Sequence, residues 1–122
     1  MHELSVCLSL MEQVEQIARE HGASSVTRII LSVGPLSGVE SELLRHAYPL
    51  AIAGTVAADA ELVMESADIV VRCSQCESET SVVPNKLLCG ACGDYRTRVI
   101  SGDELTLMSV ELDTSGEPPD TR

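Results

Sequence analysis

Four of the five cysteines fall in two closely spaced pairs. They read Cys73-Ser-Gln-Cys76 and Cys89-Gly-Ala-Cys92, with twelve residues between the pairs. A two-residue gap lets both sulfurs of a pair turn toward one ion, and two such knuckles supply the four thiolates of a closed tetrahedral zinc site. Gly93 follows the second knuckle and suits the positive φ that such a turn requires. The spacing therefore predicts a structural Zn(II) site.

Other chemistry is open to the same four sulfurs. Iron in a rubredoxin-like cage also accepts four thiolates, and the spacing does not distinguish it from zinc. Two disulfides, or four unrelated thiols, are simpler interpretations. A redox protein that uses its Cys-x-x-Cys pairs would need an exposed thiol of low pKa, and tight zinc binding would argue against it.

The N-terminal residues Met1-His2-Glu3 form a second candidate site. A bulky second residue prevents removal of the initiator methionine, so the Met1 amine, the His2 imidazole and the backbone amides between them are clustered by covalent geometry. Nitrogen-rich, square-planar donor sets of this kind suit Ni(II) or Cu(II). The residues alone favour a simpler interpretation, an ordinary exposed histidine. His21, at a helix end, and His46, within a helix, are better explained as structural or surface residues.

Composition limits the classes of partner. The chain has 122 residues, a formal net charge of −11 and a single lysine, Lys86. Binding nucleic acid requires a basic patch to neutralise phosphates, so nucleic acid is excluded as a partner. The chain also lacks Phe and Trp, so its core must consist of aliphatic side chains. A bound metal would then contribute a larger share of the folding stability.

The sequence also bears on location. No apolar run approaches the roughly 20 residues that cross a bilayer, and His2 and Glu3 stand where a signal peptide would be basic. Free thiols meant for a metal suit a reducing compartment. We therefore expect a soluble, cytoplasmic protein with no membrane association.

Hydrophobic periodicity predicts the elements that must position both sites. An apolar stripe with helical spacing predicts a helix from Leu4 to Glu20, ended by Gly22, with Cys7 on its buried face. Val26 to Val33 reads as a strand. A second helix is predicted over about 40–53, kinked or divided by Pro49. Further strands are predicted at 61–66, 69–72, 80–83, 95–100 and 104–112.

This order predicts an α+β fold in which two helices pack on a three-stranded sheet, with a four-cysteine zinc ribbon inserted before the last strand. Residues 1–67 and 103–112 would form the α/β domain that carries the N-terminal site. Residues 68–102 would form the zinc ribbon. The polar segment 113–122 is predicted to be a disordered tail.

Taken together, these motifs resemble the HypA/HybF family of nickel metallochaperones. Met1-His2-Glu3-Leu4-Ser5, Val33-Gly34, Ser37-x-Val39-Glu40 and the cysteine quartet carry the resemblance, which covers residues 1–112. Pro49 and the lack of Phe in the second helix depart from the family pattern. The resemblance implies transient Ni(II) binding through Met1, His2 and Glu3, with His2 as the anchoring ligand. It also implies structural Zn(II) on Cys73, Cys76, Cys89 and Cys92, with Glu40 near the nickel site.

The function implied by the resemblance is delivery of nickel for maturation of [NiFe]-hydrogenase, and in some organisms of urease. The implied partners are a HypB-type GTPase, the hydrogenase large subunit precursor and urease accessory proteins. The residues do not suggest an enzyme, because the sequence has neither a G-x-x-x-x-G-K-[ST] phosphate loop nor an H-E-x-x-H motif. The alternative is a zinc-ribbon interaction module whose N-terminal histidine is incidental.

Overall fold

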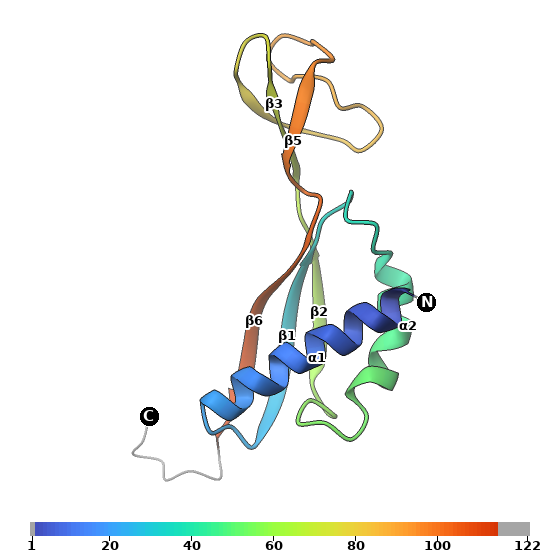
Figure 1. The fold of residues 1–122 in the computed structure, drawn as a ribbon, viewed down its shortest axis with the longest axis vertical. Coiled ribbons are helices and arrows are strands. Elements are labelled where there is room, and N and C mark those ends of the chain that lie inside the picture. Colours follow the sequence, from blue (N-terminus) through green and yellow to red (C-terminus); the bar gives the residue numbers. More distant parts are fainter. Residues whose placement is uncertain (1, 115–122) are drawn as a thin grey trace. The chain divides into compact units, whose positions relative to one another are not determined.

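The residues that the structure describes form two helices and two three-stranded sheets (Figure 1). A computed structural model describes the backbone of residues 2–114 and the side chains from Glu3 onward. The elements are α1 (His2–Glu20), β1 (Ser25–Val33), α2 (Ser41–Ile52), β2 (Glu61–Ser66), β3 (Ile69–Cys73), β4 (Glu79–Val82), β5 (Thr97–Ser101) and β6 (Leu105–Asp113). The sheets have the orders β2-β1-β6 and β4-β3-β5. The predicted α+β fold is confirmed.

The chain divides into two compact units. The first unit contains Met1–Leu31, Glu40–Met64 and Leu107–Arg122, and the second contains Ser32–Val39 and Glu65–Thr106. The predicted insert, 68–102, falls within the second unit, and the finer domain boundaries stay a prediction. Most of the predicted tail, residues 115–122, lies outside the described residues, whereas Asp113 ends β6.

The buried face of α1 is narrower than its apolar pattern. Its core side chains are almost fully buried: Cys7, Leu10, Met11, Val14 and Ala18. Leu4 and Leu8, which have helical spacing with Cys7 and Met11, are 37% and 50% exposed. At 100° per residue they lie on the flank of the face that meets the rest of the first unit.

A Schellman motif ends α1. Gly22 adopts φ 65°, the Ala23 N–H donates to Ala18 O at 2.9 Å, and the Gly22 N–H donates to Arg19 O at 3.2 Å. Glycine takes this backbone conformation without a steric penalty. The predicted stop at Gly22 is therefore confirmed, and it turns the chain into β1.

The second helix runs through Pro49 as one element, so it is not divided as one form of the prediction had it. Proline removes a single backbone N–H near the end of a helix that buried Leu44, Ala51 and Ile52 hold against the core. Packing therefore offsets the lost hydrogen bond. Among the helices of the described region, none combines the length and apolar character needed to cross a membrane.

Strand β1 lies in the centre of the first sheet. Val26, Ile29, Leu31 and Val33 are all at most 6% exposed, and the last three alternate onto one buried face. The Thr27 hydroxyl donates to Glu111 O at 3.1 Å, and the Ser24 N–H donates to Asp113 O at 3.0 Å. Strand β6 therefore pairs with β1 although the cysteine-containing segment lies between these strands in the sequence.

The second sheet is antiparallel, with β3 between β4 and β5. Ile69, Val71 and Cys73 alternate onto its buried face, at 1% or less exposed. Val70 and Arg72 point to the opposite face because successive strand residues alternate. This register places Cys73 at the end of β3, where the metal-binding segment begins.

Gly34 packs closely against the backbone of Gly102 and Glu104 within the second unit. Its N–H donates to Glu104 O at 3.0 Å, and a Cβ at this position would lie 2.4 Å from Gly102 O. Because backbone cannot yield as a side chain does, we expect Gly34→Ala to lower the free energy of unfolding by about 1–3 kcal/mol.

Denaturant unfolding of zinc-loaded protein would measure this loss. Gly54→Ala is the control, because Gly54 has φ +77° but no atom within 4 Å of an added Cβ. That variant should show only the left-handed backbone penalty, about 1 kcal/mol. Gly34→Ala protein as stable as the parent would contradict the packing described here.

Candidate metal sites

The four cysteines Cys73, Cys76, Cys89 and Cys92 converge in the second unit. Their sulfur atoms all lie within 4.8 Å of one another. The Sγ–Sγ distance is 3.6 Å between Cys73 and Cys92 and 3.5 Å between Cys76 and Cys89. The two turns, whose first cysteines are sixteen residues apart, thus each bring one buried and one exposed cysteine to a common point.

The two turns are near copies of each other. In the first, the N–H groups of Gln75 and Cys76 donate to Cys73 Sγ at 3.3 and 3.4 Å. In the second, the N–H groups of Ala91 and Cys92 donate to Cys89 Sγ at the same two distances. Such amide donors stabilise a thiolate, so each turn prepares its first cysteine as a ligand.

The residue after each pair has a positive φ. Gly93 adopts φ 79°, as predicted, and Glu77 adopts φ 63° in the equivalent position. The Gly93 N–H donates to Cys89 O at 2.9 Å, and the Glu77 N–H donates to Cys73 O at 3.0 Å. Glu77 accepts a conformation that glycine takes more easily, because the turn geometry requires it.

The sulfur positions fit a tetrahedral ion. Zinc–sulfur bonds of about 2.3 Å at tetrahedral angles place sulfurs roughly 3.8 Å apart, close to the observed 3.5 and 3.6 Å. All four cysteines are free thiols, and a disulfide would need about 2.05 Å. Four thiolates suit zinc, and they equally suit iron.

Hydrogen bonds move the acidities of these thiols in opposite directions. Ser78 lowers the pKa of Cys76 to about 6. The Cys92 and Ala91 amides lower the pKa of Cys89. The Asp94 amide lowers the pKa of Cys92, but hydrogen bonding to Cys73 and burial raise it to about 12. Adjacent thiolates repel, so full ionisation of the cluster calls for a cation among the sulfurs.

Polar residues outside the cysteine motif hold the second turn. The Gly90 N–H donates to Thr80 Oγ1 at 2.8 Å, and the Cys89 N–H donates to Asp94 O at 2.9 Å. Arg96 in turn donates twice to the Asp94 carboxylate, at 3.0 and 2.9 Å. Thr80, Asp94 and Arg96 are not among the sites predicted from the sequence; the short Asp-x-Arg spacing after the last cysteine is a local signal for two of them.

At the N-terminus, the structure assigns a position to Glu3. The helix α1 starts at His2, while Met1 and the His2 side chain lie outside the described residues. Glu3 is only 6% exposed, and its Oε2 accepts a hydrogen bond from the Glu40 N–H at 3.3 Å. Glu40 is the N-cap of α2, so the carboxylate lies at the positive end of that helix.

His21 lies far from that point, His46 is on α2 and Cys7 belongs to the core. His21 follows α1, about 28 Å along the helix axis from His2 at 1.5 Å per residue, and its Nδ1 lies 2.9 Å from Ile17 O. His46 is exposed on α2. Cys7 is 2% exposed, as expected of a core residue, and its thiol donates to Leu44 O at 3.7 Å. Burial, followed by the Glu3 charge, raises its pKa.

The contact between Glu3 and α2 carries a stability prediction. Glu3→Ala removes an acceptor from a part-buried N–H, which should lower the free energy of unfolding by about 1–3 kcal/mol. Glu3→Gln keeps an acceptor oxygen and should lose less. The matched control is Glu12→Ala, an exposed glutamate on the same helix. Equal losses for Glu3→Ala and Glu12→Ala in chemical denaturation would refute the contact.

One family of known proteins matches the part of the chain that contains both candidate sites. Residues 1–112 match the family described as "Hydrogenase/urease nickel incorporation, metallochaperone, hypA". The chain is 52% identical over 115 residues to a hydrogenase maturation factor HypA of Nitrosospira multiformis, covering 94% of this chain and 100% of that protein. It is 42% identical to a HypA of Aquifex aeolicus, covering 93% of this chain and 98% of the relative.

A solved structure shares the fold. The solution structure of the Ni metallochaperone HypA from Helicobacter pylori matches with a TM-score of 0.71 at 23% identity, covering 92% of this chain and 97% of that one. At this identity the likeness speaks for the fold alone.

Proposed function

The chain belongs to the HypA family of nickel-incorporation metallochaperones, and we propose that it binds Ni(II) at its N-terminus for delivery to a maturing [NiFe]-hydrogenase. A member of this family is a hydrogenase maturation factor and not an enzyme. The observation that carries the proposal is the family match over residues 1–112, which includes both the N-terminal motif and the cysteine quartet.

The proposed nickel site is made of nitrogen donors. The Met1 amine, the His2 imidazole and the backbone amides of His2 and Glu3 would hold Ni(II), which favours such donors. The Glu3 carboxylate already bonds the Glu40 amide, so we assign it the role of positioning the start of α1. A terminal site of this kind can release its cargo, whereas a closed cage would retain it.

The cysteine cluster is proposed as a structural Zn(II) site. Its four sulfurs lie within 4.8 Å of one another, and a tetrahedral ion bound by all four would have no position left for a substrate. Zinc would supply cross-linking between the two turns, and the amides on Cys73 and Cys89 would offset thiolate charge. Metal analysis of the purified protein, together with its visible absorption, distinguishes colourless zinc from coloured iron.

The partners and location are further parts of the proposal. The family name supports hydrogenase-related partners; the finer assignments are a HypB-type GTPase, the large subunit precursor and, for urease, its accessory proteins. The sequence has no phosphate-binding loop, so any GTP hydrolysis would come from the partner. Free thiols suit transfer in the reducing cytoplasm.

A nickel titration tests this function. We expect untagged, zinc-loaded protein that begins at Met1 to bind about one Ni(II) per chain in calorimetry. Protein with Gly-Ser placed before Met1 should lose this binding, because the amine becomes an amide. Binding that survives the extension would remove the amine from the site. If neither protein bound nickel, the four-cysteine interaction module would be the better account.

A further inference from the structure

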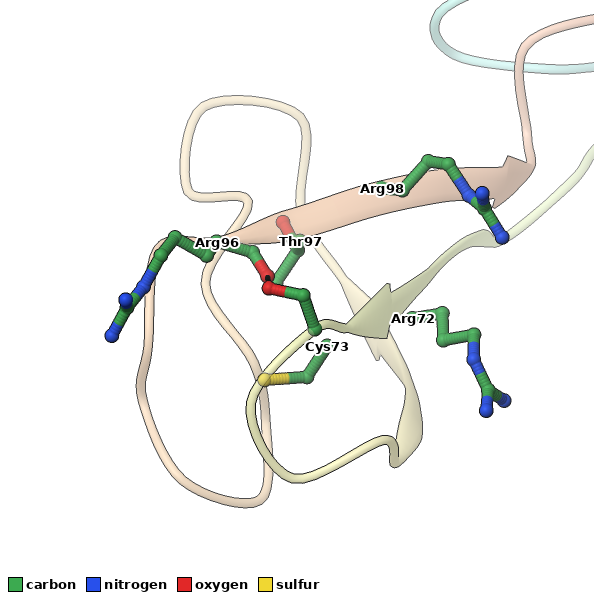
Figure 2. A pocket seen from close by; sticks show the side chains of 6 residues that line it. Arg72, Cys73, Arg96, Thr97 and Arg98 are labelled. Carbon is green, nitrogen blue, oxygen red and sulfur yellow. Dashed lines mark hydrogen bonds between the residues drawn. The ribbon is translucent and has the colours of Figure 1, made fainter.

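Two arginines stand directly opposite each other on the sheet of the second unit. Arg72 in β3 and Arg98 in β5 are register partners in the antiparallel ladder. Figure 2 shows their guanidinium groups extending to the same side of the two strands. Directly opposed like charges destabilise a sheet. The pair therefore costs the fold stability that a neutral pair would not.

Acidic neighbours relieve this repulsion on one side only. Arg72 pairs with Glu79 at 3.2 Å and with Glu77 at 4.0 Å. Arg98 is exposed and makes no ion pair with any residue that the structure describes. Glu79, Arg72 and Arg98 lie side by side on three neighbouring strands. Of the two arginines, Arg98 is the one whose charge no described acidic residue balances.

The same arginines line a hollow of about 450 Å³ together with Arg96. The other lining residues are Cys73, Ser74 and Thr97, so no acidic side chain contributes to the lining. Three of the eight basic residues of a chain with net charge −11 gather here. The hollow is therefore a local basic site on an acidic protein.

The metal cluster explains Arg96 but not the opposed pair. Asp94 first, and then the charges of Cys73 and Cys92, raise the pKa of Arg96, so this arginine offsets thiolate charge. Cys73 and Thr97 form the next register pair. The Arg72–Arg98 pair precedes it along the ladder and lines the same hollow, and the ion pairs of Arg72 are with Glu79 and Glu77 rather than with a cysteine.

We propose that Arg72 and Arg98 form a docking site for carboxylates of an acidic segment of a partner protein. Two guanidinium groups on adjacent strands can each hold a carboxylate through paired N–H donors. The net charge of −11 opposes a long polyanion such as nucleic acid. The described residues of the second unit include no helix, so the helix N-terminus that often binds phosphate is missing there.

Fluorescence anisotropy with a labelled hexaglutamate peptide tests the proposal on full-length, zinc-loaded protein without nickel. We expect saturable binding that weakens with salt, and roughly fivefold or greater weakening in Arg98→Gln. Arg28→Gln is the matched control, because Arg28 is exposed in β1 and pairs with Glu61 and Glu111. That variant should bind the peptide like the parent.

Zinc content and thermal unfolding identify any general damage. Arg98→Gln should keep its zinc and be at least as stable as the parent, since it removes a like-charge contact. Absence of peptide binding, equal binding by Arg98→Gln, or equal weakening by Arg28→Gln would each overturn the proposal. So would tighter binding of tripolyphosphate or a single-stranded oligonucleotide than of the peptide.

Discussion

Replacement of Cys73 by serine is expected to abolish stoichiometric zinc binding and to unfold the sheet of the second unit. Cys73 is completely buried, its sulfur accepts two amide hydrogen bonds, and it lies 3.6 Å from Cys92 Sγ. Structural zinc contributes about 10–16 kcal/mol in small domains, which is comparable with the whole stability of a typical protein, about 5–15 kcal/mol.

The short strands around the cluster cannot replace that contribution. Strands β3, β4 and β5 have four or five residues each, and Ile69, Val71, Cys73 and Cys89 are the residues of this unit's β3–β5 segment with almost complete burial. We therefore expect amide hydrogen exchange across residues 69–101 to rise sharply in Cys73→Ser, while α1 and β1 keep their protection.

Cys7→Ser is the control for this experiment. It makes the same chemical change at a buried cysteine outside the cluster. This variant should retain one zinc per chain and lose only about 1 kcal/mol of stability. Retention of stoichiometric zinc by Cys73→Ser, with unchanged exchange, would show that the cluster is not the metal site.

Replacement of His2 by alanine is expected to weaken Ni(II) binding by about 100-fold or more, since even supporting residues of metal sites are worth 10- to 100-fold. His2 supplies the imidazole of the proposed site, and His21 is at the far end of α1. Competition titration against a chelator of known nickel affinity would measure the change.

The loss should be specific to nickel. His2 is the first residue of α1, so its replacement should leave zinc content and the unfolding midpoint nearly unchanged. His21→Ala and His46→Ala are matched controls that should bind nickel like the parent. Parent-like affinity in His2→Ala would rule out the imidazole as a ligand, and a loss in His46→Ala would relocate the site to α2.

Most of the local structure was predictable. The helical stripe of α1 contains Cys7, Met11 and Val14, which are three or four residues apart. The alternation in β1 involves residues two apart. Both patterns are short-range, so the periodicity of the sequence reveals them. The cysteine pairs are equally local, because a two-residue gap determines how a turn aims its sulfurs. Even the positive φ of Gly93 followed from its place after the turn.

Packing overruled some local patterns. Leu4 and Leu8 have helical spacing yet stay exposed, since only part of an apolar stripe meets the rest of the first unit. Pro49 has a strong local tendency to break a helix, but buried Leu44, Ala51 and Ile52 keep α2 continuous. Tertiary contacts outweigh propensities of a few kcal/mol at single positions.

The sequence by itself determined the fold class, the two candidate metal motifs and the family resemblance, because each resides in neighbouring residues or in their order along the chain. Only the tertiary structure decided which distant residues meet. Glu3 reaches the Glu40 amide, and Arg72 faces Arg98 across two strands. Such pairs depend on strand register and on helix packing, and neither produces a periodic pattern in the sequence that would reveal the pair.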